Sequence, residues 1–595
     1  MRILVADFEV FKYDWYLCVK DFVTEEEVFS AWNDREGLMK MYEENKDYIF
    51  VGYNFKGYDQ YIFKAILLGM NPYPVSKFII GGGDGWDYSR NTFSKVPLNF
   101  YEVQYKQGLG LKKLEGFMGF SIEESEVDFD IDRPLTQAER ELTEKYCKHD
   151  VDSTSAVLFH KWDDFRALHK MCKLFNRPRR DMCKTKAQLV SKGLGAEKRV
   201  FYDEFDLRLP ETLILDKYRY VADWFMNSVE NVRSMMEAEG LDWRNKGLFR
   251  KVFYGDKNIL LTDVDGIEVK FAWGGGHGAR KGFIYECKPD EVLIMYDVDQ
   301  LYPNLMIKYN LMSRAITKPK KFEEILETSL RLKAEEKVDE RMPYKTTCNS
   351  IYGISGADFM PTYDPLHRNL VCVFGQLLLL DLIEKVEDIS ETVQFNTDGI
   401  LSIVKRKDLE EFKSRVHAWE NRTYLKMSFT ECKRVIESNV NLYILEQNNG
   451  KVKYVGGRVK KRDVLDNDMP IIRDALVNYL MYGIKPEETI YGCDDFMKFQ
   501  NILLRGNTFS YTEHNDKRYY HKYFRVYASK DESDGPLRKV KIENGKIRKV
   551  KMGPEHAFIY NDDVRNMKCP DKLDKSYYVD IVYHQHKQFM EGDDE

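Results

Sequence analysis

One stretch organises the rest of this chain: Glu291-Val-Leu-Ile-Met-Tyr-Asp297-Val-Asp-Gln-Leu-Tyr302-Pro303. The apolar run at 292–295 predicts a buried β-strand, which ends by presenting the carboxylate of Asp297. A rigid strand with an Asp at its end is a good way to hold a metal ligand. A core strand that simply ends in Asp would look the same. The metal interpretation therefore needs a second carboxylate, a phosphate-binding cation and a nucleic-acid groove elsewhere in the chain.

Length and composition set the general class. The 595 residues predict roughly three to five domains. A hydrophobic content of 43% with 32% charged residues indicates a soluble globular protein with an ample core. The net charge of −6 does not indicate a nucleic-acid partner, but it does not exclude one, because a channel needs only local Lys and Arg.

The cysteines and the apolar runs indicate the compartment. Ten cysteines are scattered without a CxxC pair, so neither a zinc site nor a disulfide framework is indicated, and a reducing cytoplasm fits best. We find no signal-peptide pattern and no apolar run long enough to span a bilayer. A membrane partner is therefore not expected.

The first 160 residues carry acidic side chains on three predicted elements. A strand at 3–10 places Asp7 and Glu9 on one face, because side chains alternate along a strand. A second short strand runs into a polar turn that carries Asp59. A helix predicted over 138–155 places Tyr146 and Asp150, four residues apart, on one side.

This set of side chains has a definite metal preference. Four carboxylates and an aromatic hydroxyl, without a cysteine or histidine cluster, form a hard-oxygen site suited to Mg²⁺ or Mn²⁺. Acids this close repel one another unless divalent ions neutralise them, and two such ions can activate water against a phosphodiester. A purely structural carboxylate network is the alternative.

The order and spacing of these groups resemble the exonuclease motifs of the 3′–5′ proofreading domain of family B DNA polymerases. Those motifs are Asp-x-Glu, Asn-x(2–3)-Phe/Tyr-Asp and Tyr-x(3)-Asp, and all three are intact. The resemblance implies two metal ions held by the four carboxylates, with Tyr146 orienting the attacking water. It implies that Asn54 and Tyr58 bind the single-stranded 3′ end. Leu111-Lys-Lys-Leu114 resembles a further primer-terminus motif of phage polymerases, with Gly110 in place of the usual Ser or Thr.

The middle of the chain contains a glycine cluster at Trp273-Gly274-Gly275-Gly276. Consecutive glycines allow a close backbone approach, to a phosphate backbone or to another strand. The cluster resembles the Tyr-x-Gly-Gly motif that binds template between the two modules of the family, with Trp273 in the place of Tyr. An ordinary turn is the alternative. The amphipathic helix predicted over 216–239 has an aromatic stripe that we assign to the core.

A cationic segment follows the opening stretch. A helix predicted over 322–341 carries cations four residues apart, a spacing that continues to Lys345. We expect Pro343 to end this helix and start the next, which would place Lys345 in a first turn, where it forms a phosphate site. Asn349 and Tyr352 follow one turn later on the same side. The earlier cations are Lys333, Lys337 and Arg341.

The second carboxylate comes from residues 392–404. Two strand-like runs flank Asn396-Thr-Asp398-Gly399, which predicts a hairpin with Asp398 at its tip. An ordinary Asx-Gly hairpin is the alternative. Together with the opening stretch and the Lys345 segment, it supplies the missing ligand.

These three stretches resemble polymerase motifs A, B and C of family B. The motifs read Asp-x(2)-Ser-Leu-Tyr-Pro, Lys-x(3)-Asn-Ser-x-Tyr-Gly and Asp-Thr-Asp-Ser, with Gln300, Asn396 and Gly399 departing here. The resemblance implies that Asp297, Val298 and Asp398 bind two metal ions and that Tyr302 rejects a 2′-hydroxyl. It also implies a dNTP site formed by Lys333, Arg341, Lys345, Asn349 and Tyr352.

Two further segments point to DNA contacts. Residues 440–444 resemble the Lys-x-Tyr primer-binding motif with Asn441 in place of Lys, so Tyr443 is retained, and the cationic contact is either lost or moved to Lys451 or Lys453. The basic stretch 538–551 contains an Asn544-Gly545 hairpin turn and could follow a phosphate backbone.

The resemblance implies an α/β multidomain fold: an RNase H-like exonuclease domain followed by a right-hand polymerase with an antiparallel palm sheet, short helical fingers and a thumb. The expected segments are exonuclease 1–160, connecting segment with the Gly-rich template motif 161–290, palm 291–315 and 354–462, fingers 316–353, and thumb with C-terminal region 463–595.

The expected function is template-directed DNA synthesis on a primer, with 3′–5′ proofreading, in phage or viral DNA replication. Only 41 residues separate Pro303 from Lys345 and 44 separate Gly353 from Asp398, too few for the two insertions of protein-primed phage polymerases. We therefore expect a compact monomer in the cytoplasm of a bacterial host. Its expected partners are a DNA primer–template and dNTPs, with a processivity factor, helicase or single-strand-binding protein as candidates. The rivals are a nuclease with a decayed polymerase half and a non-enzymatic DNA-binding protein.

Overall fold

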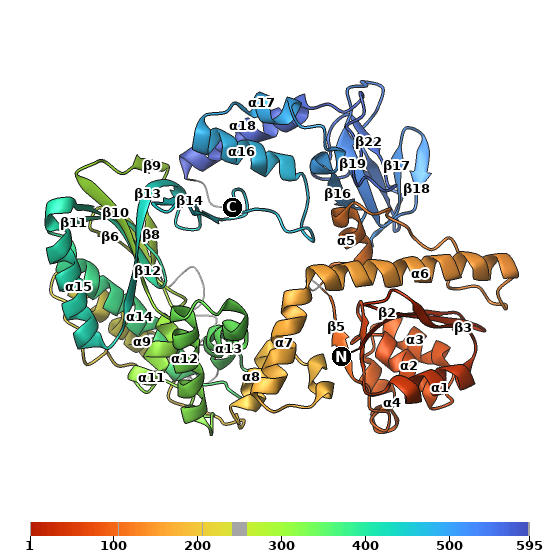
Figure 1. Cartoon of the computed structure of the whole chain (residues 1–595), viewed down its shortest axis with the longest axis horizontal. Helices are drawn as coiled ribbons and strands as arrows, with labels where there is room; N and C mark the ends of the chain where they lie inside the picture. The colour runs from red at the N-terminus through yellow and green to blue at the C-terminus, as the bar shows by residue number, and fades with distance from the viewer. Residues whose placement is uncertain (1, 105, 107, 205, 241–258, 593–595) are drawn as a thin grey trace. The chain divides into compact units, whose positions relative to one another are not determined.

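The computed structural model describes residues 2–104, 106, 108–204, 206–240 and 259–592 (Figure 1). The chain is a mixed α/β protein with several sheets, and it divides into two compact units. Unit 1 comprises residues 1–185, 462–478 and 484–582, and unit 2 comprises residues 186–461, 479–483 and 583–595. No helix among the described residues is both long enough and apolar enough to cross a membrane.

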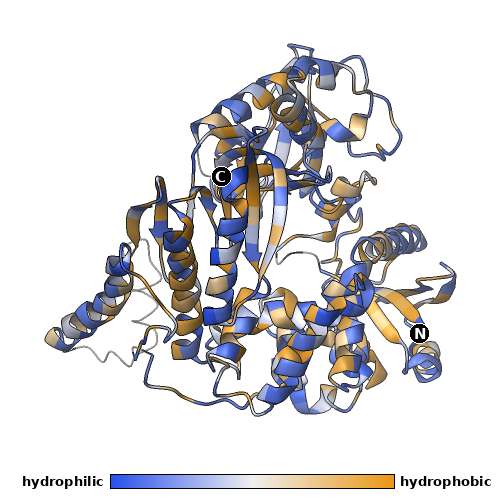
Figure 2. Ribbon diagram, turned by 60° about the vertical axis from the view of Figure 1, so that its left-hand side comes forward, coloured by the Kyte–Doolittle hydropathy of each residue, from blue (hydrophilic) through white to orange (hydrophobic). Residues whose placement is uncertain are grey.

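Unit 1 is built around a five-stranded sheet. Its strands are β1 (Ile3–Val10), β2 (Trp15–Asp21), β3 (Glu27–Trp32), β4 (Ile49–Gly52) and β5 (Phe100–Glu102). They lie in the order β3-β2-β1-β4-β5, with β1 antiparallel to β2 and parallel to β4. β1 is buried along almost its whole length, and hydrophobic residues dominate the strands near the N-terminus in Figure 2.

Helices cover both faces of this sheet. They are α1 (Arg35–Asn45), α2 (Asp59–Leu67), α3 (Pro72–Ile80), α4 (Gly85–Phe93), α5 (Leu111–Met118), α6 (Gln137–His160) and α7 (Trp162–Leu174). α1 to α4 share an apolar core with one face of β1, and α6 packs against β1 from the other side. α6 starts at a capping box, because Thr136 and Glu139 each accept the other's backbone amide.

The C-terminal part of unit 1 consists of two small sheets and helices. The strands are β16 (Asn501–Leu504), β17 (Phe509–His514), β18 (Lys517–Tyr519), β19 (Tyr523–Ala528), β20 (Arg538–Lys541), β21 (Ile547–Lys549) and β22 (Ala557–Ile559). The sheet orders are β16-β19-β22 and β18-β17-β20-β21. β20 and β21 form the hairpin predicted around Asn544-Gly545. The helices are α16 (Pro470–Tyr482), α17 (Pro486–Tyr491) and α18 (Ser576–Glu591), and the last residues of α16 and of α18 belong to unit 2.

Unit 2 contains a ten-stranded sheet. Its strands are β6 (Leu260–Val264), β7 (Ile267–Phe271), β8 (His277–Ala279), β9 (Phe283–Glu286), β10 (Glu291–Val298), β11 (Ser390–Phe395), β12 (Gly399–Lys405), β13 (Met427–Asn439), β14 (Leu442–Gln447) and β15 (Val452–Val455). β10 is the predicted central strand, and it pairs antiparallel with β12 on one side and β13 on the other. The backbone of the opening stretch is therefore held on both edges.

The helices of unit 2 are α8 (Lys186–Gly193), α9 (Arg219–Ala238), α11 (Leu301–Lys308), α12 (Pro319–Ala334), α13 (Val338–Ser355), α14 (Pro365–Val386) and α15 (Leu409–Thr423). α14 is buried along most of its length, which explains its long apolar sequence. The predicted helix at 216–239 is α9, and Phe225 from its aromatic stripe is buried as expected.

The predicted helix boundary at Pro343 is wrong. α12 ends before Glu336, whose backbone is left-handed with φ of 55°. α13 begins at Val338 and continues through Pro343. Proline this close to a helix start removes only one interior hydrogen bond, so the helix tolerates it. Lys345 therefore lies beyond the first turn of α13, and the break between the two helices interrupts the predicted row of cations.

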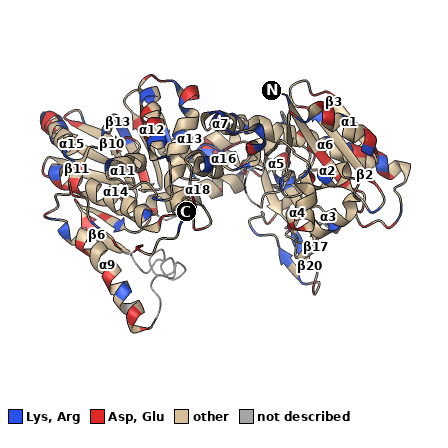
Figure 3. Cartoon of the chain, turned by 90° about the horizontal axis from the view of Figure 1, so that it is seen from below, with Lys and Arg blue, Asp and Glu red and all other residues tan. Residues whose placement is uncertain are grey.

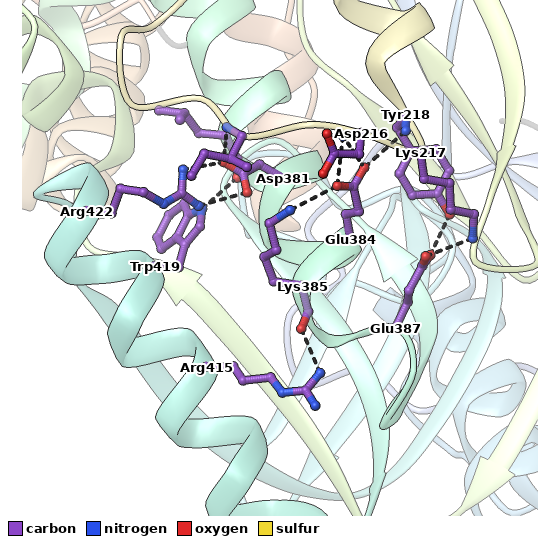
Figure 4. A network of polar contacts seen from close by, with 12 residues as sticks. Asp216, Lys217, Tyr218, Asp381, Glu384, Lys385, Glu387, Arg415, Trp419 and Arg422 are labelled. Atoms are coloured by element: carbon purple, nitrogen blue, oxygen red, sulfur yellow. Dashed lines mark hydrogen bonds and ion pairs between the residues drawn. The ribbon is translucent and has the colours of Figure 1, made fainter.

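Acidic side chains on α14 hold the extended segment that precedes α9 (Figure 4). Asp381 accepts the amide of Ile214 at 3.1 Å, and Glu384 accepts that of Tyr218 at 3.1 Å. Glu387 accepts the Tyr218 hydroxyl at 2.6 Å. The acids thus satisfy an otherwise unpaired backbone. They fix the start of α9 against the helix that also packs on α11.

Candidate functional sites

A cluster of acids lies between the sheet and α6 in unit 1. Asp7 and Glu9 share one face of β1, as predicted, and Cys147 of α6 joins them. One ligand atom from each of the three lies within 4.8 Å of the others. The Cys147 thiol donates to the Asp7 carbonyl oxygen at 3.4 Å. Neither the thiol nor its contact with Asp7 was expected from the sequence.

Asp59 and Asp150 complete this group, which we call the unit 1 carboxylate cluster: Asp7, Glu9, Asp59 and Asp150. Burial raises the pKa of Asp59 to about 8, and Glu102 adds to the shift. Burial also raises the pKa of Asp150 to about 6, although Lys112 opposes the shift. The pKa values of Asp7 and Glu9 rise well above normal, first through burial and then through repulsion within the cluster. Such a group carries its full charge only beside cations, so its chemistry fits hard divalent ions.

Tyr146 lies beside this cluster on α6. Burial raises its pKa, and Asp150, Glu9 and Asp7 raise it further. The side chain is therefore a neutral hydroxyl that can donate a hydrogen bond to water near the carboxylates. This placement agrees with the i, i+4 spacing seen in the sequence.

Sequence reasoning missed Lys112 and Glu115 of α5. The Lys112 ammonium contacts Asp150, lies 3.2 Å from Glu115 and lies 4.3 Å from the centre of the Tyr146 ring. Glu115 is fully buried, and one of its oxygens groups with His149 and Asp150 within 4.8 Å. The sequence signals were the place of Lys112 in the Leu111–Leu114 motif, where a DNA contact was expected instead, and the i, i+3 spacing of a Lys and a Glu on a short helix. Nothing local shows that this helix faces α6.

The three predicted DNA-binding residues of unit 1 lie on segments next to the cluster. Asn54 has a left-handed backbone (φ 62°), and its amide donates to Glu102 at 2.9 Å. Tyr58 precedes Asp59 and shares a 2.7 Å hydrogen bond with Ser76. Leu111 is the first residue of α5 and is partly exposed. Their contacts with DNA remain predictions.

In unit 2, Asp297 and Asp398 lie on adjacent strands and form the unit 2 carboxylate pair. Asp297 pairs with Gly399 across β10 and β12, and the Val298 amide donates to the Asp398 carbonyl oxygen at 2.7 Å. Burial and then Asp398 raise the pKa of Asp297 to about 6, while Lys453 and Lys333 oppose the shift. The two carboxylates therefore interact, and their oxygen chemistry fits a divalent ion.

Gly399 is suited to its place beside Asp297. A Cβ atom at this position would lie 2.0 Å from the Asp297 Oδ1 atom. The Ser found in the family motif would therefore require the carboxylate to rotate. The Asn396 backbone amide donates to the Gly399 carbonyl oxygen at 2.9 Å and closes the turn, and its side-chain oxygen accepts the Thr397 amide at 2.7 Å.

A cavity of about 470 Å³ opens beside Asp398. The rings of Tyr302 and Tyr352 lie 4.2 Å apart in its wall. Gln300 also lines the cavity, and its backbone at the start of α11 is left-handed with φ of 51°. Other lining residues are Leu301, Pro303, Lys345, Cys348, Asn349 and Thr397. The structure thus brings Tyr302 together with Lys345, Asn349 and Tyr352, which come from two separated stretches of the sequence.

Two residues predicted to contact the dNTP, Lys333 and Arg341, do not line this cavity. Lys333 contacts Asp299 and lies 3.2 Å from the Ser428 hydroxyl. Arg341 donates to the Ser329 carbonyl oxygen at 3.1 Å, which ties α13 to α12. Lys333 is still close enough to lower the pKa of Asp297. The triphosphate roles of both residues remain predictions.

Lys453 is the cation that approaches the carboxylate pair from β15. Its ammonium lies 5.7 Å from the centre of the Tyr443 ring, and it lowers the pKa of Asp297. Tyr443 itself is buried in the sheet at 2% exposure. Lys451 is exposed in the turn before β15. Of the two cations proposed to replace the Lys at position 441, Lys453 is the one near the acids.

The glycine cluster lies beside the turn that carries Asp398. A Cβ at Gly275 would lie 3.3 Å from the Thr397 hydroxyl, and one at Gly276 would clash with Phe395. These glycines permit the backbone to approach the turn closely, and Gly274 faces open space. Trp273 differs from expectation: its ring is 1% exposed and packs against Phe225, so the side chain serves the core.

The sheet of β17, β18, β20 and β21 is strongly basic (Figure 3). Arg538 lies directly opposite Lys549, and Lys539 lies opposite Arg548. Like charges in such pairs destabilise a sheet, which an anionic ligand would relieve. Burial lowers the pKa of Lys539, and Lys551 and Arg548 lower it further.

Similarity to known proteins is found among solved structures. No protein-family model matches the chain, and no curated protein sequence matches it. Among solved structures, the chain is similar to the family B DNA polymerase from the hyperthermophilic archaeon Pyrobaculum calidifontis. The identity is 15% and the TM-score is 0.42, over 99% of this chain and 78% of that one.

Proposed function

We propose that this protein is a DNA-directed DNA polymerase with 3′–5′ exonuclease activity. The observation that carries the proposal is the unit 2 carboxylate pair beside the cavity lined by Lys345, Asn349 and two tyrosines. The unit 1 carboxylate cluster supports a separate hydrolytic site. A role in phage or viral DNA replication, and the assignment of exonuclease, palm, fingers and thumb to the segments given above, belong to the same proposal.

The polymerase reaction joins the primer 3′-hydroxyl to the α-phosphate of a dNTP, and the bond to pyrophosphate breaks. Asp297 and Asp398 would hold two Mg²⁺ or Mn²⁺ ions, which when bound lower the pKa of the hydroxyl and neutralise the pyrophosphate. Lys345 faces the cavity as a fixed cation for the triphosphate. Asn349 lies one turn and Tyr352 two turns further along α13, where they would contact the new base pair.

Tyr302 is positioned to select the sugar. Its ring packs on Tyr352, and α11 fixes its backbone. A ring held in this way would meet an added 2′-hydroxyl on a bound nucleotide, because neither tyrosine can rotate away without disturbing the other.

The exonuclease reaction would remove a mispaired 3′ nucleotide. Water forms a bond to the phosphorus while the bond to the 3′ oxygen of the preceding nucleotide breaks. Asp7, Glu9, Asp59 and Asp150 would hold two divalent ions, which when bound activate the water. Tyr146 remains a neutral hydroxyl and can orient that water.

Contacts with DNA outside these centres are assigned by charge. Lys453 would contact the primer strand beside Asp297, and the basic sheet of unit 1 would bind phosphates. We propose a DNA primer–template and dNTPs as partners of a monomeric enzyme in a host cytoplasm. A processivity factor, helicase or single-strand-binding protein would act with it.

The departures from the family motifs do not favour a decayed polymerase. The backbone amide of Asn396 closes the turn that presents Asp398, a bond that does not depend on the side chain, and Gly399 makes space for the Asp297 carboxylate. Gln300 lines the cavity. The changes thus leave the turn and the cavity formed, while both acids and Lys345 are kept.

Primer extension tests the proposal directly. A primed DNA template with dNTPs and Mg²⁺ should give extension by the full chain, and a single-stranded oligonucleotide should lose nucleotides from its 3′ end. Extension without excision would remove only the exonuclease part. Excision without extension would favour the nuclease alternative. If the protein shows neither extension nor excision, the proposal is rejected.

A further inference from the structure

Strand β19 holds both ends of helix α5 in unit 1. Tyr523 and Arg525 are two residues apart, so both point to the same side of the strand. The Tyr523 side chain lies against Gly110, the residue that caps the start of α5, where an added Cβ would meet the Tyr523 hydroxyl at 3.4 Å. Arg525 reaches the other end of the helix.

Arg525 is fully buried, and its guanidinium bonds only to uncharged acceptors. It donates to the carbonyl oxygens of Gly116 at 3.2 Å and Phe120 at 2.6 Å. It also donates to the Asp562 carbonyl oxygen at 2.5 Å and to the Gln500 side chain at 3.0 Å. A cation at the carbonyl end of a helix is favourable, because those oxygens carry partial negative charge.

Gln500 extends the same contact. Its amide nitrogen donates to the Phe117 carbonyl oxygen at 3.1 Å, and its oxygen accepts Arg525. Asn467 donates to the same Phe117 oxygen at 3.4 Å. Three side chains from the C-terminal part of the chain therefore bind the last turn of one short helix.

α5 also carries Lys112 and Glu115. Lys112 contacts Asp150 and lies over the Tyr146 ring. α5 is only eight residues long, and an isolated helix of that length is not stable in water. Its position, and hence that of Lys112, must come from what packs on it.

We propose that Arg525 is a positioning residue for the unit 1 carboxylate cluster, and that it acts through α5 and Lys112. This inference rests on the proposed exonuclease function. It makes the C-terminal strands a structural part of the nuclease centre. Burying an arginine without a carboxylate partner costs free energy, and the role of holding α5 in place explains why Arg525 lies in the core.

The test compares two variants of the same strand in the full chain. Arg525→Met removes the donors while keeping an apolar chain of similar length. Val526→Ala is the matched control, because Val526 points to the opposite face of β19 into an apolar core with Leu503 and Phe524. Both variants disturb β19, but only the first releases α5.

We call the bonds from Arg525 to the last turn of α5 the clamp. Hydrogen exchange over residues 110–120 measures the clamp and does not require an activity assay. We expect Arg525→Met to speed hydrogen exchange of the last α5 amides at least 10-fold relative to the other amides of unit 1. Val526→Ala should leave that relative exchange rate unchanged. Equal exchange in the two variants would overturn the clamp.

Excision of a single-stranded oligonucleotide with Mg²⁺ then measures the link to chemistry. We expect Arg525→Met to lower the saturated single-turnover rate about 10-fold with little change in KM, the size expected for an outer-shell group. In a Lys112→Met background the same change should have no further effect, because both act through one ammonium. Additive effects would overturn the route through Lys112.

Primer extension by the same preparations separates this inference from the proposed function. Extension should be unchanged in Arg525→Met. If the wild type extends primers but excises nothing, the exonuclease function fails while hydrogen exchange still decides the clamp. If the wild type excises and Arg525→Met excises equally fast, the positioning role fails while the exonuclease function stands.

Discussion

The Val298 amide donates a 2.7 Å hydrogen bond to the carbonyl oxygen of Asp398. This bond joins the end of β10 to the turn before β12, so the two acids of unit 2 are fixed by backbone rather than by flexible side chains. Residues 101 positions apart in the sequence thereby form one centre. The arrangement leads to predictions for each acid and for the groups around it.

Loss of either acid should separate the two proposed activities. We expect Asp297→Asn and Asp398→Asn to lower primer extension by more than the roughly 10–100-fold that loss of an outer-shell group costs. Single-strand excision should stay within twofold, because the unit 1 cluster is intact. Full extension by Asp398→Asn would show that the β12 turn is not the second ligand.

The converse change is Asp7→Ala combined with Glu9→Ala. It removes two adjacent ligands on β1, so excision should fall below detection while extension continues. Mispaired primer ends should then be extended without removal. Gel analysis of matched and mismatched primers measures both effects, and retained excision would contradict the assignment of the cluster.

The unit 1 cluster should make stability depend on pH and metal. The pKa of Asp59 rises from 3.8 to about 8 on folding. The folded chain therefore binds more protons than the unfolded chain between these values, and stability falls as pH rises through that range. We expect the Tm of metal-free protein to drop from pH 5 to pH 8, and Mg²⁺ to raise it more at pH 8. Asp59→Asn should flatten this dependence.

Tyr302→Val should relax sugar selection. The ring packs on Tyr352 in the cavity wall, and removing it opens space beside a bound nucleotide. Steric contacts of this kind give discrimination of about 10–200-fold. The ratio of dNTP to rNTP incorporation should fall by a factor in that range, while dNTP incorporation changes little. An unchanged ratio would place the sugar contact on another residue.

Lys453→Met should shift the pH dependence of extension. Lys453 lowers the pKa of Asp297 from its raised value, so its loss raises that pKa further. The acidic limb of the rate profile should move to higher pH, and primer affinity should fall. Lys407→Met, at an exposed helical position, is the control and should behave as the wild type.

The sequence predicted the strands and turns that carry acids better than the helices that carry cations. β10 and the β12 turn follow from short apolar runs and an Asx-Gly pair, which are local signals. The break between α12 and α13 depends on the left-handed backbone at Glu336, which no proline or glycine marks. Lys345 nevertheless reaches the cavity, because the face of a helix depends on residue spacing and not on where the helix starts.

Other features lay beyond any local signal. Lys112 acts through the contact between α5 and α6, and Trp273 is buried because it meets Phe225 of α9. Both depend on packing between segments far apart in the chain. The role of Gly399 also required the structure, since only the pairing across β10 and β12 shows that a side chain there would meet Asp297.

The bonds from Arg525 to α5 also set an order on synthesis. Arg525 follows Gly116 by 409 residues, and all of unit 2 up to residue 461 lies between them. At ribosomal speeds of about 5–20 residues per second, the guanidinium leaves the ribosome some 20–80 s after the helix it holds. Residues 186–461 of unit 2 can therefore be synthesised while unit 1 still waits for its last strands. A nascent chain stopped before β19 would contain α5 without the Arg525 bonds that hold its last turn.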